Sequence, residues 1–493
     1  MSITLHVRLL SGRTFSAEAL LDVDVGTLKH QAESALAVGN GRLVHSSGEE
    51  LDSMRTIREC GLQTGDVLNL QLQPVMVLSS RGQMYAAFAA ILGDGSVAAW
   101  GPADHGGHTG AVQDQLRKVQ QVQASTSTFA AVIAGGSVLT WGDAVGDSNA
   151  VQYQLTDVQR LQSTFGAFAA ILGNGSVVTW GHADVGGDSS AVRDELRNVQ
   201  QIQASHLAFA AILGNGSVVT WGLADGGGDS SAVKHQLRNV TQIQATLRAF
   251  AAILADGSVV TWGDAESGGD SSVVQSQLRN AQQIQANHRA FAAILGDGSV
   301  VTWGHADWGG NARAVKDRLK RVQQIQATHY AFAAILEDGS VVTWGGSDGG
   351  GDSSAVQHQL KNVKQIQAAA GAFAAILGDG GVVTWGHDGG GGDSTAVQEQ
   401  LRNVQQVQAS FYAFAAILGN RSVVTWGHAD AGGESSAVQK QLRNVTQIQA
   451  SLRAFAAILA DGSVVTWGHV TGGGDSSAVQ DQLCNRQNLA SEA

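Results

Sequence analysis

Cysteine, proline and long hydrophobic runs are scarce in this chain of 493 residues. Its two cysteines, Cys60 and Cys484, are far apart and cannot form a disulfide framework, which favours a reducing compartment, the cytoplasm or the nucleus. No run approaches about 18 consecutive apolar residues, so we expect no membrane-spanning segment. The first residues alternate like a strand, which argues against a signal peptide.

Charged residues are also scarce. Only 15% of the residues are charged, and 42 acidic side chains outnumber 30 lysines and arginines, which gives a formal net charge of -12. An acidic chain lacks the attraction that dominates binding to nucleic acids, and anionic lipid repels it for the same reason. We therefore expect neither nucleic acid nor membrane as a partner. The apolar share of 43% is typical of a globular chain.

The first 73 residues show the order strand, strand, helix and shorter strands. Apolar residues at alternate positions predict the first strand: Ile3, Leu5 and Val7. Apolar residues four apart predict a helix over 27–37: Leu28, Ala32 and Leu36. This order resembles the ubiquitin-like fold, and the segments that carry the resemblance are 9–14, 42–44, 55–57 and 65–70.

The resemblance implies a ubiquitin-like β-grasp domain over 1–73, which would serve either as a docking module or as a folded cap. The exposed apolar patch of that family would map onto Leu10, Val44 and Gln71, and the glutamine at the third position weakens it. Ubiquitin and its conjugated relatives end in a diglycine, whereas this segment continues into Pro74 and beyond. We therefore do not expect the head to be attached to a substrate through its own carboxyl end.

The rest of the chain repeats with a period of 41 residues. The dipeptide Trp-Gly occurs ten times, and one spacing is 39 instead of 41. The tryptophans are Trp100, Trp141, Trp180, Trp221, Trp262, Trp303, Trp344, Trp385, Trp426 and Trp467. A fixed period of this length predicts a propeller, a solenoid or an array.

One unit, residues 199–239, illustrates the predicted elements. Three strands are expected at 199–204, 208–213 and 217–222, and the second is apolar on both faces and therefore buried on both sides. Asn-Gly or Asp-Gly joins the second and third strands, which indicates a hairpin with a type I′ turn. Further on, Asp229 offers a helix cap, and apolar residues at helical spacing predict about two helical turns. Those apolar residues are Val233, Leu237 and Val240.

Each unit resembles a repeat of the regulator of chromosome condensation family. In that family a strand with small residues, an apolar strand, Asp-Gly and a strand ending in Trp-Gly follow one another. The length of 41 residues is closer to the propeller-type β-lactamase inhibitor, and the resemblance covers roughly 77–491. Known relatives form closed seven-bladed propellers, and ten units depart from that number. We expect a mainly β chain with a β-propeller-like repeat array over 74–493; an open β-solenoid or superhelix is the alternative.

The ends of the array bear on whether it closes. Residues 485–491 look like a worn copy of the first strand and could complete the first unit. Such a strand would close a ring and remove two exposed sheet edges. Alternatively, residues 75–79 fill that place and the array stays open.

No catalytic constellation stands out from the repeat pattern. A histidine follows Trp-Gly in half of the units, and glycine-rich stretches such as 389–393 recur, but neither shows the spacing of a metal site. Serine, histidine and aspartate recur where turns need them. We therefore expect no enzymatic activity, no cofactor and no metal.

Two loops differ between units while the strands stay constant. The turn after the first strand and the loop after Trp-Gly share one edge of each sheet, and the Asp-Gly turn lies on the other. A rigid scaffold often presents function on such loops. Aromatic, histidine and arginine side chains that could anchor a protein partner gather there: His288, Arg289, Trp308, His329, Tyr330, Phe411 and Tyr412.

These observations predict a non-catalytic scaffold or adaptor that binds protein partners through its variable loops. The two resemblances add a link to ubiquitin-related processes. Two alternatives stay open: a subunit or relative of a HECT-type ubiquitin ligase that lacks the catalytic domain, and a guanine-nucleotide exchange factor for a small GTPase. The expected partners are accordingly proteins, either components of the ubiquitin pathway or a small GTPase.

Overall fold

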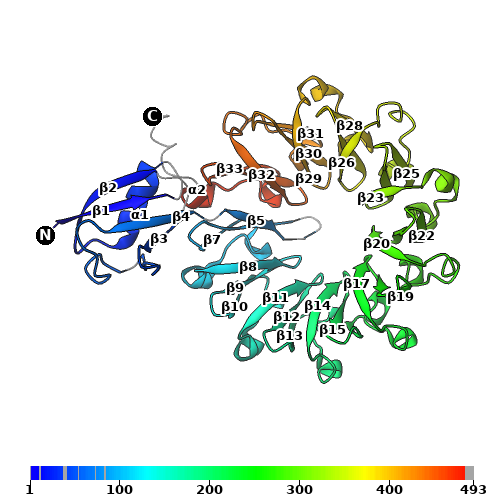
Figure 1. Cartoon of the computed structure of the whole chain (residues 1–493), viewed down its shortest axis with the longest axis horizontal. Helices are drawn as coiled ribbons and strands as arrows, with labels where there is room; N and C mark the ends of the chain where they lie inside the picture. Colours follow the sequence, from blue (N-terminus) through cyan, green and yellow to red (C-terminus); the bar gives the residue numbers. More distant parts are fainter. Residues whose placement is uncertain are drawn as a thin grey trace.

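The computed structural model describes residues 2–9, 13–36, 41–53, 55–72, 74–80, 82 and 85–483. A small head with one helix precedes a ring of three-stranded sheets (Figure 1). No helix within these described ranges is long and apolar enough to cross a membrane.

The head is a four-stranded sheet in the order β2-β1-β4-β3, covered by one helix. Its elements are β1 (Ser2–Arg8), β2 (Thr14–Leu20), α1 (Val25–Ala35), β3 (Gly41–His45) and β4 (Val67–Leu72). Strand β1 pairs antiparallel with β2 and parallel with β4. The helix begins where the Asp24 carboxylate accepts a hydrogen bond from the Thr27 amide at 2.7 Å. The predicted helical stripe is confirmed, since Leu28, Ala32 and Leu36 are buried.

Ten units follow, each with one antiparallel sheet of three strands. The first strands lie nearest the centre of the ring (Figure 1): β5 (Met76–Ser79), β8 (Val119–Ala124), β11 (Val158–Ser163), β14 (Val199–Ala204), β17 (Val240–Ala245), β20 (Ala281–Ala286), β23 (Val322–Ala327), β26 (Val363–Ala368), β29 (Val404–Ala409) and β32 (Val445–Ala450). The middle strands are β6 (Phe88–Ile91), β9 (Thr128–Ile133), β12 (Ala167–Leu172), β15 (Ala208–Leu213), β18 (Ala249–Leu254), β21 (Ala290–Leu295), β24 (Ala331–Leu336), β27 (Ala372–Leu377), β30 (Ala413–Leu418) and β33 (Ala454–Leu459). The third strands are β7 (Val97–Trp100), β10 (Val138–Gly142), β13 (Val177–Gly181), β16 (Val218–Gly222), β19 (Val259–Gly263), β22 (Val300–Gly304), β25 (Val341–Gly345), β28 (Val382–Gly386), β31 (Val423–Gly427) and β34 (Val464–Gly468).

The middle strand of each unit is buried on both faces, as the sequence predicts. In β15, Ala208, Phe209, Ala210 and Ala211 have no exposed surface. Small alanines let neighbouring sheets approach closely, while the phenylalanine fills the space beside the tryptophan of the third strand. The two rings of Phe209 and Trp221 stack with their centroids 5.1 Å apart.

The turn between the second and third strands differs from the predicted type I′ turn. In the fourth unit Gly216 has φ +75°, whereas Asn215 is outside the left-handed region. The amide of Gly216 donates to the carbonyl of Leu213 at 2.8 Å, and the amide of Leu213 donates to the carbonyl of Ser217 at 2.9 Å. This is a three-residue loop that ends in a left-handed glycine. The Asn215 side chain fixes this form because it accepts from the Ser217 amide at 3.0 Å. Two units depart: in the second Gly135 also has positive φ, and in the ninth Arg421 takes the place of the left-handed glycine.

The helical turns predicted after the tryptophan are wrong in kind and extent. Short 3-10 helices follow Trp-Gly in each unit: η1 (Ala103–His105), η3 (Ala144–Gly146), η5 (Ala183–Val185), η7 (Ala224–Gly226), η9 (Ala265–Ser267), η10 (Ala306–Trp308), η12 (Ser347–Gly349), η13 (Asp388–Gly390), η15 (Ala429–Ala431) and η16 (Val470–Gly472). Several units add an outer one, and the last unit ends in an α-helical turn: η2 (Gly110–Gln115), η4 (Asn149–Gln154), η6 (Ser190–Val192), η8 (Ser231–Val233), η11 (Arg313–Arg318), η14 (Thr395–Gln400), η17 (Ser477–Val479) and α2 (Gln480–Leu483).

A left-handed residue explains why a longer helix cannot form there. In the fourth unit Leu237 is buried as predicted, but Asn239 has φ +55°. A residue in that conformation ends a right-handed helix, so Val240 begins strand β17 instead of continuing a helical stripe. The predicted cap is present in shortened form, since the Asp229 carboxylate accepts from the Ser231 amide at 2.8 Å.

Neighbouring units meet at a junction that recurs around the ring. Trp262 Nε1 of the fifth unit donates to the carbonyl of Gly227 in the fourth at 3.0 Å. Gly227 has φ +93°, and a Cβ there would lie 2.5 Å from the ring of Phe250. The glycine-rich loop is therefore a packing element, because no larger residue fits under the aromatic ring.

The same junction joins the last unit to the first. Trp100 Nε1 donates to the carbonyl of Gly473 at 3.0 Å, and one apolar cluster combines residues of both units, among them Val77 and Ile458. Residues 75–79 and 485–491 were the two candidates for the first strand of the first unit. Strand β5 occupies that position, and the array is nevertheless closed. Residues 485–491 lie outside the described residues. No ladder joins the sheets of neighbouring units in the described part of the chain, so the ring closes by side-to-side packing.

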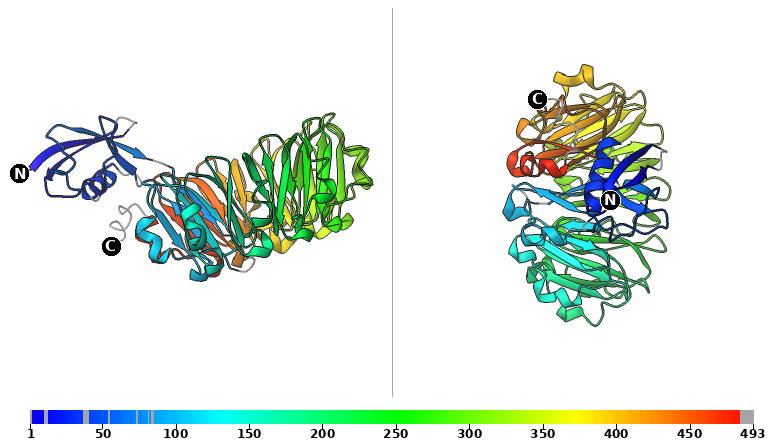
Figure 2. Two further views of the ribbon diagram at one scale, coloured as in Figure 1. Left: turned by 90° about the horizontal axis from the view of Figure 1, so that it is seen from below. Right: turned by 90° about the vertical axis from the view of Figure 1, so that its left-hand side faces the viewer.

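The head contacts the ring at the edge that carries the Asp-Gly turns, beside the first and last units (Figure 2). Lys29 Nζ of α1 lies 3.2 Å from the carboxylate of Asp94, in the turn of the first unit, and 3.8 Å from Glu33. Lys118 and Glu50 form a second contact at 3.9 Å. Burial alone would raise the pKa of Asp94, but the Lys29 ammonium and local hydrogen bonds outweigh it and hold this pKa below its usual value.

Candidate functional site

Two loops of each unit meet on the edge of the ring opposite the Asp-Gly turns. In the fourth unit Ser205, the first residue of the turn after β14, accepts from the Ala208 amide at 3.0 Å. Its hydroxyl donates to the carbonyl of Gly226, in the helix after Trp-Gly, at 2.9 Å. In the sixth unit Asn287 takes the place of this serine, and its side-chain amide donates to the carbonyl of Trp308 at 2.6 Å. The two variable loops therefore lie together, as the strand directions predict.

All seven residues singled out from the sequence belong to one connected cluster on this edge. Its ring and cation–ring contacts are Arg289 over Trp308 (5.3 Å), Trp308 to Tyr330 (4.6 Å), Tyr330 to His329 (6.0 Å), His288 to His329 (3.6 Å), His329 to Phe411 (4.9 Å) and Phe411 to Tyr412 (4.5 Å). The cluster spans four units because the intervening Ala370 is small and leaves room for its neighbours. We refer to these seven side chains as the aromatic cluster.

Exposure is uneven within the aromatic cluster. Tyr330 and Tyr412 are exposed, at 40% and 43%. Trp308 is only half-buried instead of freely exposed, because Arg289 and Tyr330 cover its ring. The cluster thus presents a preorganised surface of rings whose contacts are already made, which lowers the conformational cost of binding a partner.

The two histidines of the cluster are uncharged at neutral pH. Burial and, after it, the neighbouring His329 lower the pKa of His288 to about 3. Burial also lowers the pKa of His329 to about 4. With both imidazoles neutral, their stacked rings act as aromatic surface and bring no positive charge to the centre of the cluster.

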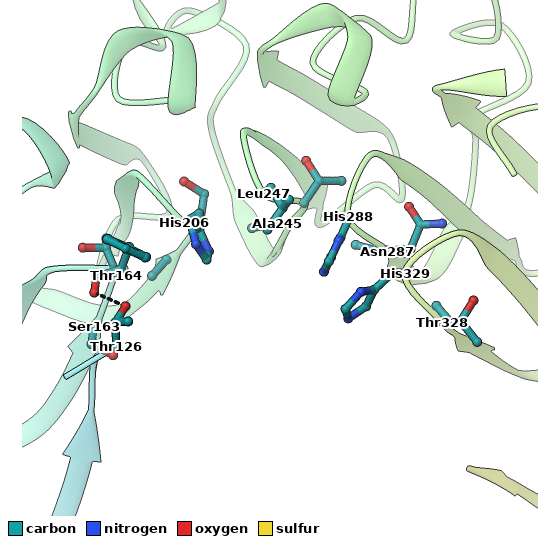
Figure 3. A pocket seen from close by; sticks show the side chains of 16 residues that line it. Thr126, Ser163, Thr164, His206, Ala245, Leu247, Asn287, His288, Thr328 and His329 are labelled. Carbon is teal, nitrogen blue, oxygen red and sulfur yellow. Dashed lines mark hydrogen bonds between the residues drawn. The ribbon is translucent and has the colours of Figure 1, made fainter. Parts of the chain in front are cut away.

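The inner part of the same edge surrounds a cavity of about 300 Å³ (Figure 3). The middle residue of each first turn lines it, from Thr126 through Phe165, His206 and Leu247 to His288 and His329. Backbone bonds between units hold these turns together: the Phe165 amide donates to His206 at 2.9 Å, and that of His206 to Leu247 at 3.1 Å. We call this set the mouth.

Phe165, His206 and Leu247 were not among the residues predicted from the sequence. They occupy the same middle position of the first turn as His288 and His329. Aligning the ten units and reading that single column would have revealed them. Phe165 is 42% exposed and its ring lies 5.2 Å from that of His206, so aromatic surface continues around the mouth beyond the aromatic cluster.

Two of the three positions of the patch predicted on the head lie within the described residues. Val44 pairs with Asn69 on β4 and is only 9% exposed, so it offers little surface to a partner. Gln71 pairs with Arg42 in the same ladder and is half-buried. Leu10 lies outside the described residues.

The described residues include no group of three or more histidine, cysteine, aspartate or glutamate side chains that could hold a metal ion. Of the histidines that follow Trp-Gly, His182 lies 4.0 Å from Asp184 on an exposed loop. His469 caps the 3-10 helix η16, where its ring accepts from the Thr471 amide at 3.2 Å. Both positions are explained by local loop structure.

No protein-family model matches the chain, and no curated protein matches it. Among solved structures, Prp20p from Saccharomyces cerevisiae, described with its binding to Gsp1p and histones, is similar at 15% identity over 56% of this chain and 82% of its own, with a TM-score of 0.32. The ectodomain of the Physcomitrella patens receptor kinase CR4 is similar at 14% identity, 60% and 77% coverage, and a TM-score of 0.34. A designed protein based on ubiquitin is 24% identical over 14% of this chain and 87% of its own, with a TM-score of 0.14. These scores are too low to transfer a property of those proteins to this chain.

Proposed function

We propose that this chain is a non-catalytic scaffold that binds a protein partner through the loop edge of its ring. The observation that carries the proposal is the aromatic cluster: seven bulky side chains from the sixth, seventh and ninth units make one continuous surface on an otherwise repetitive ring. Tryptophan, tyrosine and arginine are the residue types that dominate binding energy at protein interfaces. We further propose that the chain acts in the cytoplasm or the nucleus.

The head supports a more specific version of this function. Its sheet order, with β1 paired to β2 and β4 around a single helix, is compatible with a ubiquitin-like domain. In this version the head is a second docking module, placed on the edge that the loops do not use. A link to ubiquitin-related processes rests on that resemblance, and the relation to ligases of the HECT type rests on the resemblance of the repeats to the regulator of chromosome condensation family. The small-GTPase alternative has no residue of its own in the loop edge to support it.

The test is comparative capture from cell lysate with the full chain as bait. Partners would be identified by mass spectrometry with the unaltered protein, with Trp308→Ala/Tyr330→Ala, and with Tyr153→Ala as a matched control. Tyr153 is an aromatic side chain that is 81% exposed and lies far from the aromatic cluster. We expect a set of proteins that the double variant loses and the control retains. Equal capture by all three baits would contradict the proposal.

A further inference from the structure

The outer surface between the fifth and sixth units contains a groove of about 410 Å³. Its walls are the outer segment of the fifth unit, with Val273 and Val274, and the segment after Trp303 in the sixth, with Arg313 and Lys316. Trp308 of the aromatic cluster lies in that second segment, two residues before the lining residue Gly310.

A matching groove of about 480 Å³ lies between the seventh and eighth units and shows what this position looks like elsewhere. There Ala355 stands in place of Val273, Thr395 in place of Arg313 and Gln398 in place of Lys316. Its acidic lining residues are Asp352, Asp388 and Asp393, and it has no basic one. The groove between units five and six has two bases and one acid, Asp270.

Three departures from the repeat therefore converge on one groove. Val273 is the single valine at a position that is alanine in the other nine units, and it is 85% exposed. Asn311 replaces an acid that most units carry two residues before the Arg313 position. Arg313 and Lys316 add positive charge to a chain whose net charge is -12. Together they make the groove more apolar and more basic than its counterpart.

The bases of this groove are available to a ligand. Lys316 Nζ bonds the neutral amide of Gln277 at 3.1 Å, and no carboxylate lies within ion-pair distance of Arg313 or Lys316 in the described part of the chain. By contrast, Lys234, at the matching position of the fourth unit, is paired with Glu195 at 2.7 Å. The carboxylate of Asp270 is engaged by the Ser272 amide at 2.8 Å.

Basic charge continues along the same outer segment beyond the groove. Residues 313–321 carry five basic side chains and one acidic one, and all five bases are exposed. They are Arg313, Lys316, Arg318, Lys320 and Arg321. Arg321 lies 3.5 Å from the carboxylate of Glu337, whereas the other four bases have no carboxylate within ion-pair distance in the described part of the chain. Such exposed charges of one sign attract and orient a partner of the opposite sign.

We propose that the groove between the fifth and sixth units binds an acidic peptide segment of a partner protein, with aliphatic side chains placed against Val273 and Val274. The carboxylates of the segment pair with Arg313 and Lys316. This proposal rests on the proposed function in that it names the chemistry of the partner that the loop edge would hold.

The experiment measures fluorescence anisotropy of a labelled peptide, Ala-Glu-Glu-Leu-Glu-Glu-Leu-Ala, titrated with the full chain. We expect saturable binding that weakens as salt is raised, and weaker binding of the peptide with glutamine in place of glutamate. Arg313→Thr/Lys316→Gln should bind roughly fivefold more weakly, because two exposed ion pairs with the peptide are lost. Its melting temperature should hold, because the same residues occupy the groove between units seven and eight.

Two further variants sharpen the test. Lys440→Gln/Arg443→Gln removes the same charge from the exposed outer segment of the ninth unit and should leave peptide binding unchanged. Ala355→Val/Asp393→Asn/Thr395→Arg/Gln398→Lys rebuilds the second groove on the pattern of the first, and titration calorimetry should then show a second binding site.

Several outcomes would overturn the groove proposal. These are absence of saturable binding, equal binding of the glutamine peptide, no effect of Arg313→Thr/Lys316→Gln, and tighter binding of labelled oligouridylate that depends on the same two residues. If the peptide fails while lysate capture still depends on Trp308, the groove proposal is wrong and the proposed function stands. If the peptide binds as expected and capture ignores Trp308, the proposed function is wrong.

Discussion

The edge of the ring with the Asp-Gly turns and the edge with the variable loops are built from the same ten units, yet only one of them varies. On the turn edge the backbone of each turn packs closely against the next unit: a Cβ on Gly216 would lie 2.8 Å from the Cα of Asn239, and the Val240 amide donates to the carbonyl of Gly216 at 2.9 Å. On the loop edge the contacts between units are confined to a few positions, such as the carbonyl of Gly227 and the backbone of the first turns. The difference teaches that a repeat can change where its neighbour does not touch it.

Gly227 is the position on the loop edge where one unit packs tightly against the next, and we expect the largest loss of stability there. Gly227→Ala places a methyl group against the ring of Phe250 in a left-handed conformation. Overpacking and backbone strain together predict destabilisation of roughly 2–4 kcal/mol. Urea unfolding would measure it, with Gly389→Ala as control, since a Cβ there meets only His387 at 3.2 Å. Equal stability of the two variants would contradict the junction.

The second prediction tests whether the variable loop edge binds the partner. Trp308→Ala/Tyr330→Ala is expected to weaken partner binding by roughly 2 kcal/mol or more, on the usual scale of interface anchors. The melting temperature is expected to stay within a degree or two of the original, because the backbone anchor from Asn287 remains. If binding is lost instead on altering the turn edge, for example by Asn215→Ala, the partner binds at the turn edge and the prediction is wrong.

One residue breaks the uniformity of the turn edge. Arg421 occupies the position of the left-handed glycine with φ +63°. Arg421→Gly removes this strain and is expected to stabilise the chain by roughly 0.5–1 kcal/mol. The reverse change in the fourth unit, Gly216→Arg, is expected to destabilise by a comparable or larger amount. Thermal melts of both variants check the opposite signs, and a shift in the same direction for both would refute the interpretation.

The last prediction concerns pH. His288 and His329 have pKa values of about 3 and 4 in the folded chain, below the 6.5 of an ordinary histidine. The unfolded chain therefore binds more protons, so this contribution to stability is complete above pH ~6.5 and is lost as the pH falls toward 4. His288→Gln/His329→Gln is expected to flatten the fall in melting temperature between pH 7 and pH 5. His182→Gln, on an exposed loop, is expected to leave the slope as it was.

The repeat itself and most of the loop edge follow from the sequence. Strand alternation, the spacing of Trp-Gly and the direction of each strand place Trp308 and His288 on the same edge before any coordinates are known. Those inferences work because period and direction are local properties of the chain. The constant spacing of Trp-Gly also implies that equivalent loops of neighbouring units lie side by side, which brings the residues of the aromatic cluster together.

Other features depend on contacts that a single unit does not reveal. The type I′ turn is wrong because the Asn215 side chain satisfies its own loop, and the helix is wrong because Asn239 adopts a left-handed conformation to meet the next turn. The mouth residues Phe165 and His206 were missed because each unit contributes one of them. The buried state of Val44 and the contact of Lys29 with Asp94 depend on how the chain packs in space.

The seam between the tenth and first units has a consequence for how the molecule comes apart. A linear repeat array frays from its ends, since a terminal unit has one neighbour and is the least costly to melt. Here Trp100 closes onto Gly473, so every unit has two neighbours and no unit is terminal. Releasing any one of them breaks two junctions and exposes two apolar faces at once. The ring is therefore expected to melt as a single cooperative block, with the seam no weaker than any other joint.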